Sequence, residues 1–143
     1  MKVTLCGSLE FTEEIGEVAS ELKENGFEVV IPKTSKKILE GDVSLSKIKE
    51  EKNTGEIVER AKDLDVIRYY FKKIKNSDSI LVINKDKHGI KNYIGGNVLL
   101  EMGFAHVLDK KIYLWNPIPN MRYTDEIKVM KPKVIDQNIE ELR

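Results

Sequence analysis

The run Ser79–Ile83 (SILVI) is the feature that most narrows the folds open to this chain. After Ser79 it is apolar at every position, which is typical of a parallel strand that is covered on both faces. Segments with the 3.6-residue apolar spacing of a helix lie on either side of it along the chain. A strand buried between helical layers predicts an α/β fold with a central parallel sheet.

The rest of the chain continues this alternation of strands and helices. Four other β-rich runs predict further strands: Lys2–Leu5, Phe27–Ile31, Lys111–Trp115 and a short one beginning at Val134–Ile135. With right-handed crossovers, this order predicts a three-layer open parallel sheet of four or five strands, flavodoxin-like or Rossmann-like.

The connection between the second and third strands is less regular. Lys33–Asn53 is polar, lysine-rich and interrupted by Gly41, and we expect a loop there with a short helix over Ser44–Glu51. Apolar residues at helical spacing predict a helix from about Thr54 to Asn76. A twelve-residue loop, Asn84–Gly95, is expected after the third strand.

Size and charge restrict the class of partner. The length of 143 residues fits one domain spanning residues 1–143. Lys plus Arg and Asp plus Glu number 24 each, so no basic surface is expected to gather nucleic acid, and a small ligand is the better expectation. No apolar run is long enough to span a bilayer, the N-terminus lacks a signal peptide's apolar stretch, and a cytoplasmic location follows. The single cysteine, Cys6, excludes an intrachain disulfide framework.

Glu101 is the strongest candidate for a functional residue. It is the only formally charged residue in Val98–Val107, and its neighbours at helical spacing are apolar. An ionised carboxylate in such surroundings costs free energy unless it has a partner or a task. Its expected place in or near the first turn of a helix aims it at the ligand crevice, and the helix dipole there opposes the rise in pKa, so we expect it to be ionised when substrate binds. A glutamate that only favours the helix dipole is the alternative.

Other candidates lie in the loops after the first and third strands, because ligands of open α/β sheets bind at the carboxyl ends of strands. Cys6, Gly7 and Ser8 form the expected turn after the first strand, and its N–H groups and hydroxyl suit a phosphate or a sugar. A plain strand-to-helix connection explains that turn equally well. Asn84 opens the second loop, and its end holds four further candidates: Tyr93, Gly95, Gly96 and Asn97.

The remaining chemistry-bearing residues favour structural roles. His106 has no second ligand at metal spacing, so no metal site is expected. His88 and the lysines at 85, 87 and 91 could meet a phosphate, but a solvated charged loop is the commoner arrangement. The aromatic residues at 69, 70, 71 and 115 could stack on a base, yet their spacing favours core positions.

One known family combines these features. CGS after the first strand, SILVI, a glycine-containing loop and the segment LLEMGFAHVLDKKIYLWNP together resemble the nucleoside 2-deoxyribosyltransferase superfamily, whose helix motif E-x-G-x-A is Glu101, Gly103 and Ala105 here. The resemblance is specific over about Ser79–Pro117. A related branch, which hydrolyses deoxynucleoside monophosphates, also carries C-G-S after its first strand.

The resemblance implies a role for Glu101 as the nucleophile that attacks the anomeric carbon and forms a covalent glycosyl ester. It further implies that Gly7 and Ser8 line the sugar or phosphate pocket, that Asn97 faces the ligand and that Asn120 lies near the sugar. It implies no metal or cofactor, a nucleoside or nucleotide as substrate, and a homodimer that completes its sites across subunits.

The chain departs from the family at two acidic positions. The transferases have an aspartate where this chain has Gly95, and the hydrolase branch has serine there. A second family aspartate falls near Tyr70. The group that protonates the leaving base is therefore open, and Asp86, Tyr69, Tyr70 and Tyr93 are the candidates.

We therefore expect cleavage or transfer of an N-glycosidic bond in a nucleoside or a 5′-monophosphate. Water access to the ester would decide between hydrolysis and transfer. A non-catalytic nucleotide sensor of the same fold is the alternative. A flavodoxin-like binding module is disfavoured, because the turn after the first strand lacks a Ser/Thr-rich phosphate loop.

Overall fold

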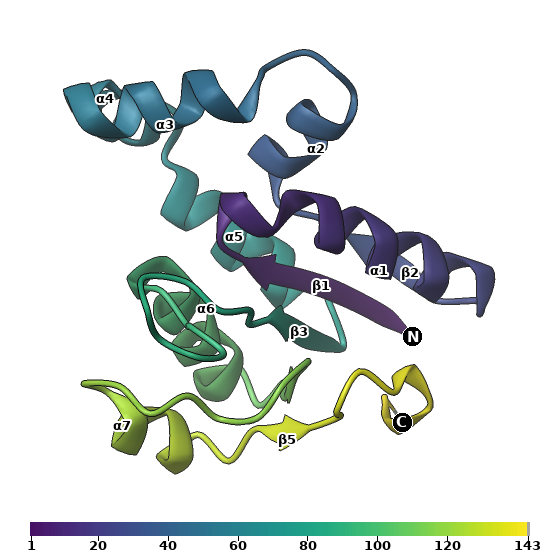
Figure 1. Ribbon diagram of the computed structural model, residues 1–143. Helices are drawn as coiled ribbons and strands as arrows, with labels where there is room; N and C mark the ends of the chain where they lie inside the picture. The colour runs from purple at the N-terminus through teal and green to yellow at the C-terminus, as the bar shows by residue number, and fades with distance from the viewer. Residues whose placement is uncertain (143) are drawn as a thin grey trace.

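The structure, a computed structural model, describes residues 1–142 apart from the side chains of residues 60, 63 and 64 (Figure 1). Its centre is a five-stranded parallel sheet with the order β2-β1-β3-β4-β5. The strands are β1 (Lys2–Gly7), β2 (Glu28–Val30), β3 (Ser79–Ile83), β4 (Lys111–Leu114) and β5 (Lys133–Val134). The predicted α/β class, parallel sheet and strand number are confirmed.

Alternate residues of β3 face opposite sides of the sheet, which explains why the strand is apolar from Ile80 to Ile83. Leu81 and Ile83 pack with α1 (Thr12–Glu24) and the C-terminal 3₁₀ turn η2 (Ile139–Glu141). Ile80 and Val82 pack on the other face with α5 (Val66–Lys75), α6 (Gly96–Val107) and α7 (Thr124–Val129). Helices on both faces of one sheet form the three layers.

The segment after β2 is more helical than predicted. The expected loop with one short helix contains two helices, α2 (Lys33–Leu39) and α3 (Leu45–Thr54). Pro32 occupies the N-cap position of α2, and the Ser44 side chain caps α3 by accepting a 3.2 Å hydrogen bond from the Lys47 N–H. Tertiary packing stabilises α3, because Ile48 is buried despite the polar composition around it.

The predicted helix from Thr54 to Asn76 is divided into α4 (Glu56–Leu64) and α5. Gly55 and Asp65 adopt left-handed backbone conformations, with φ of 83° and 45°, and each turns the chain between helices. We call α2, α3 and α4 (residues 33–64) the cap. In Figure 1 the cap lies beyond the end of β1, away from β5.

The strand order reverses direction between β1 and β3. The connection from β1 to β2 passes through α1 on one face, and the connection from β3 to β4 passes through α6 on the other. Such divergence opens a crevice at the carboxyl ends of the two strands. Contrary to the predicted turn at Cys6–Ser8, β1 continues through Gly7, which pairs with Ile83. Every helix in the described part of the chain is too short or too polar to cross a bilayer.

Candidate functional site

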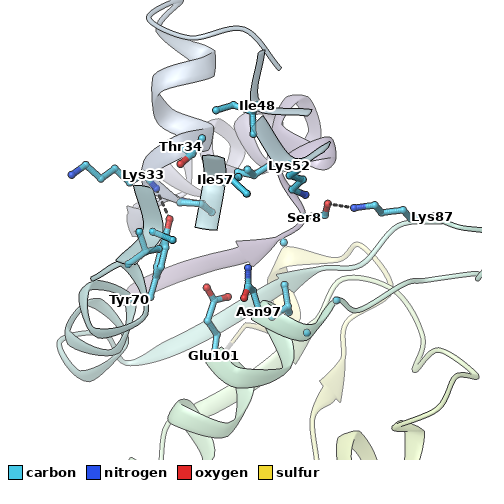
Figure 2. Close-up of a pocket in the computed structure, with 18 of the residues that line it drawn as sticks. Ser8, Lys33, Thr34, Ile48, Lys52, Ile57, Tyr70, Lys87, Asn97 and Glu101 are labelled. Carbon is cyan, nitrogen blue, oxygen red and sulfur yellow. Dashed lines mark hydrogen bonds between the residues drawn. The ribbon is translucent and has the colours of Figure 1, made fainter. Parts of the chain in front are cut away.

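A cavity of about 420 Å³ lies at the carboxyl ends of β1 and β3, between the sheet and the cap. Figure 2 shows Glu101 and Asn97 below it on α6, Tyr70 at one side and the cap residues Ile48 and Ile57 above. Its volume falls in the usual range for small-molecule sites, about 300–1,000 Å³. The cavity therefore occupies the position where this class of sheet binds ligands.

Glu101 points into this cavity from the second turn of α6 (Figure 2). The helix begins at Gly96, so Glu101 follows the first turn directly, near the position expected from the sequence. Val98, Met102 and Ala105 are buried against the sheet and fix the rotation of α6, which leaves the Glu101 side chain at the cavity wall. The side chain is partly buried.

Burial dominates the electrostatics of Glu101. It raises the pKa of the carboxyl group to about 7 from an ordinary value of 4.5, and the neighbouring Cys6 thiol, as a hydrogen-bond donor, opposes the rise. Within the described part of the chain, no ion pair joins Glu101 to a lysine, arginine or histidine. The dipole that we expected to keep this group ionised acts chiefly on the first turn, so desolvation wins and both protonation states are populated near pH 7.

Close packing at the end of β1 explains the glycine that follows Cys6. A Cβ on Gly7 would lie 3.1 Å from the Ile83 carbonyl oxygen and 3.2 Å from Ile15 Cδ1, so a larger residue would push β1 away from β3. Ser8 comes next, as the N-cap of the 3₁₀ turn η1 (Leu9–Phe11). Both Gly7 and Ser8 line the cavity.

Tyr70 extends from α5 to the opposite side of the cavity. Its phenol oxygen accepts a 2.6 Å hydrogen bond from the Lys33 N–H at the start of α2, which joins α5 to the cap. Since the oxygen serves as the acceptor, its own O–H remains available as a donor. Burial raises the pKa of Tyr70 well above its ordinary range, so the phenol stays protonated.

The loop after β3 and the start of α6 supply the rest of the floor. Tyr93 and Gly95 of the loop, and Gly96 and Asn97 of α6, line the cavity. The Tyr93 ring makes an edge-to-face contact with His88, and Lys87 Nζ lies 5.7 Å from its centre. Residues that are far from Gly7 in the sequence therefore line the same cavity as Gly7.

Three of the sequence candidates lie outside the cavity lining. Cys6 is fully buried beside Glu101, whose charge and hydrogen bonding raise the thiol's pKa further above the value set by burial. Asn84 is also buried: its side chain donates to the Asn116 and Pro117 carbonyls at 3.0 and 3.1 Å and accepts from the Asn116 N–H at 2.9 Å. Asn120 is exposed in the segment after β4.

The structure adds site residues that the sequence prediction missed. Ile48 and Lys52 on α3, and Ile57 and Ala61 on α4, line the cavity. The two residues of each pair are four positions apart, so they lie on the same face of their helix. This spacing was not recognised as a shared cavity wall because part of the segment was predicted as a loop. Lys87 also lines the cavity with a side chain only 10% exposed, so the prediction of a solvated loop is wrong for this residue.

Basic side chains outnumber acidic ones around the cavity. Among the described lining residues Glu101 is the only acid, whereas four lysines contribute to the wall: Lys33, Lys37, Lys52 and Lys87. No group of three His, Cys, Asp or Glu side chains suited to a metal ion occurs in the part of the chain that the structure describes. The arrangement combines one carboxylate, phenol and amide groups, and cationic side chains.

Comparisons of the chain with protein-family models, with curated proteins and with solved structures found no match.

Proposed function

We propose that the protein cleaves or transfers the N-glycosidic bond of a nucleoside or nucleoside 5′-monophosphate, with Glu101 as the nucleophile. The observation that carries the proposal is the Glu101 carboxyl group, which points into a ligand-sized cavity without an ion-pair partner in the described part of the chain. An unpaired carboxylate in partly buried surroundings costs stability, and groups retained at such a cost are concentrated at functional sites.

In the proposed reaction a Glu101 oxygen attacks C1′ of the sugar. The C1′–N bond breaks, its electron pair leaves with the base, and a glycosyl ester forms through an oxocarbenium-like transition state. Water then hydrolyses the ester, or a second base displaces it to give a new nucleoside. Both outcomes regenerate the carboxylate.

Tyr70 is the group best placed to help the leaving base. Its O–H remains available as a donor while its oxygen accepts from the Lys33 N–H. A phenol with a raised pKa is a weak acid, and it would act by donating a hydrogen bond to the base nitrogen as negative charge develops there. Of the other sequence candidates, Tyr69 and Tyr93 also line the cavity, whereas Asp86 does not.

One observation favours a non-catalytic nucleotide-binding protein as the second candidate. Retaining glycosidases use two carboxyl groups, and Glu101 is the only acidic residue among the described residues that line this cavity. A protein with this arrangement could bind a nucleotide and lack the means to cleave it.

Base release tests the proposal directly. The protein would be incubated with the four deoxynucleosides, the four ribonucleosides and their 5′-monophosphates, with and without a free acceptor base, and the products separated by chromatography. We expect release from at least one substrate and its loss in Glu101→Gln. Release that persists in Glu101→Gln would exclude the nucleophile, and binding without release by the wild type would favour the sensor.

The resemblance also implies a homodimer, and α6 offers a surface for it. Leu100 and Val107 are 47% and 79% exposed on this helix. These two apolar side chains would be covered if a second copy of the chain packed on this side of α6. Sedimentation of the wild type and of Leu100→Glu would test the dimer: we expect dimer for the first and monomer for the second, and a monomeric wild type would exclude it.

A further inference from the structure

The end of the cavity near Ser8 brings together two lysines from different parts of the fold. Lys87 comes from the loop after β3, and its Nζ donates a 2.8 Å hydrogen bond to Ser8 Oγ. Lys52 comes from α3 in the cap. In Figure 2 it descends toward the same end of the cavity, and Glu101 lies apart from this pair on the floor.

The two ammonium groups repel one another. Desolvation lowers the pKa of Lys52, and the charge of Lys87 lowers it further, while Glu10 acts in the opposite direction. Glu10 also lies 3.6 Å from Lys87 Nζ, but it does not line the cavity. An ammonium group has three donors, and the contacts of Lys87 with Ser8 and Glu10 leave capacity for another acceptor.

We propose that Lys52, Lys87 and Ser8 form a binding site for the phosphate monoester of the substrate, which makes a nucleoside 5′-monophosphate, rather than a free nucleoside, the ligand of this cavity. The inference rests on the proposed function and deepens it. A dianionic phosphate between the two lysines relieves their repulsion and accepts charge-assisted hydrogen bonds from both. Because Lys52 belongs to the cap and Lys87 to the β3–α6 loop, the bound phosphate also links the cap to the rest of the fold.

Binding to the Glu101→Gln protein isolates this site from catalysis. Calorimetric titration would compare each of the four deoxynucleosides with its 5′-monophosphate in that background, alone and combined with Lys52→Met or Lys87→Met. Lys47→Met is the matched control, since Lys47 lies on α3, is exposed and does not line the cavity.

We expect at least one monophosphate to bind about tenfold or more tightly than its nucleoside, and each cavity-lysine substitution to remove about tenfold of that affinity while the nucleoside's affinity stays constant. The control should change neither. Equal affinity within all four pairs, equal loss for both ligands in the lysine variants, or no binding of any monophosphate would each overturn the phosphate site.

Thermal unfolding provides a readout that needs no nucleoside. Inorganic phosphate should raise the Tm of the wild type relative to chloride at equal ionic strength, and should raise it less in Lys52→Met and Lys87→Met. Lys52→Met removes one of two repelling charges and is not expected to lower the Tm without phosphate. Lys87→Met also loses the contacts with Ser8 and Glu10, so the phosphate shift of each variant is measured against its own Tm in chloride. An equal phosphate effect in all proteins would contradict the assignment.

Failure of this inference can be separated from failure of the proposed function. If the wild type releases base from nucleosides and monophosphates with equal kcat/KM, the phosphate site is wrong and the catalytic proposal stands. If a monophosphate binds through the two lysines and no base is released, the catalytic proposal is wrong and the phosphate site stands.

Discussion

Cys6 on β1 and Glu101 on α6 are electrostatically coupled at the wall of the cavity, which Glu101 lines and Cys6 does not. The thiol lowers the pKa of the carboxyl group, and the carboxylate raises the pKa of the thiol. Cys6 is fully buried and its pKa is raised, so it remains a neutral donor rather than a thiolate. This pairing, together with burial, sets the pH range in which the Glu101 carboxyl group is ionised.

The first prediction concerns the pH dependence of base release. Only the ionised carboxylate attacks, and the pKa of Glu101 is raised to about 7. The value of kcat/KM for the free enzyme should therefore fall about tenfold per pH unit below that pKa and level off above it. A profile that is flat between pH 5 and pH 8 would contradict this role for Glu101.

The second prediction concerns Cys6→Ala. Loss of the thiol donor removes an effect that lowers the Glu101 pKa, so the acid limb of the kcat/KM profile should shift to higher pH. Cys6→Ser keeps a donor at this position and should shift the limb less. Profiles that coincide for wild type and Cys6→Ala would show that the pair is not coupled.

The third prediction concerns the free energy of unfolding of Glu101→Gln. The pKa of Glu101 is about 4.5 in the unfolded chain and is raised to about 7 in the folded protein. The stability that the protein has below pH 4.5, where this carboxyl group is neutral in both states, is therefore lost as the pH rises through about 7. The glutamine side chain stays neutral at every pH. Glu101→Gln should therefore be more stable than the wild type at pH 8, by roughly 1–3 kcal/mol, with a smaller difference at pH 5. Urea denaturation at both values measures this, with the exposed Glu13→Gln as a control that should show no such dependence.

The fourth prediction concerns Tyr70→Phe. If the phenol donates to the leaving base, its loss should lower kcat by about a hundredfold or more. It should also remove the hydrogen bond from the Lys33 N–H and lower the free energy of unfolding by about 1 kcal/mol. Tyr113→Phe removes a phenol from β4 outside the cavity and should leave kcat unchanged. A Tyr70→Phe variant with wild-type kcat would assign the base contact to another group.

The fifth prediction separates structure from binding at Asn84. Its buried side chain holds the segment after β4 through Asn116 and Pro117, so Asn84→Ala should lower the free energy of unfolding by about 2–4 kcal/mol with little change in KM. Asn120→Ala, at an exposed position outside the cavity lining, should be close to wild type in stability. A large rise in KM with unchanged stability would instead support the role in substrate binding expected from the sequence.

Local patterns were sufficient for the sheet. SILVI predicted β3 to the residue, because a strand covered on both faces is apolar at nearly every position, and here only Ser79 is polar. The single charge in the apolar segment around Glu101 identified that residue as a functional candidate, because such a charge has few structural explanations. The turn of the helix on which it lies depended on where the helix begins, which capping and the preceding loop decide.

Local patterns predicted only part of the cap: a short helix over Ser44–Glu51 and a helix from about Thr54, but neither α2 nor the turn at Asp65. Lys33–Asn53 is polar and contains Gly41, and its helices become stable only when Ile48 packs inward and when Gly55 and Asp65 turn the chain. Tyr70 was a candidate from the sequence, but its contact with Lys33 required the cap to fold back over the site.

The sequence by itself determined the alternation of strands and helices, the parallel sheet and the chemical identity of the acidic candidate, because periodicity and composition are local properties. Tertiary structure decided which side chains share the cavity. It brought Lys52 of the cap near Lys87 and Ser8, and it placed Asn84 in a buried hydrogen-bond network instead. Those neighbours are separated along the chain, and only the crossing connections of the sheet and the packing of the cap bring them within reach.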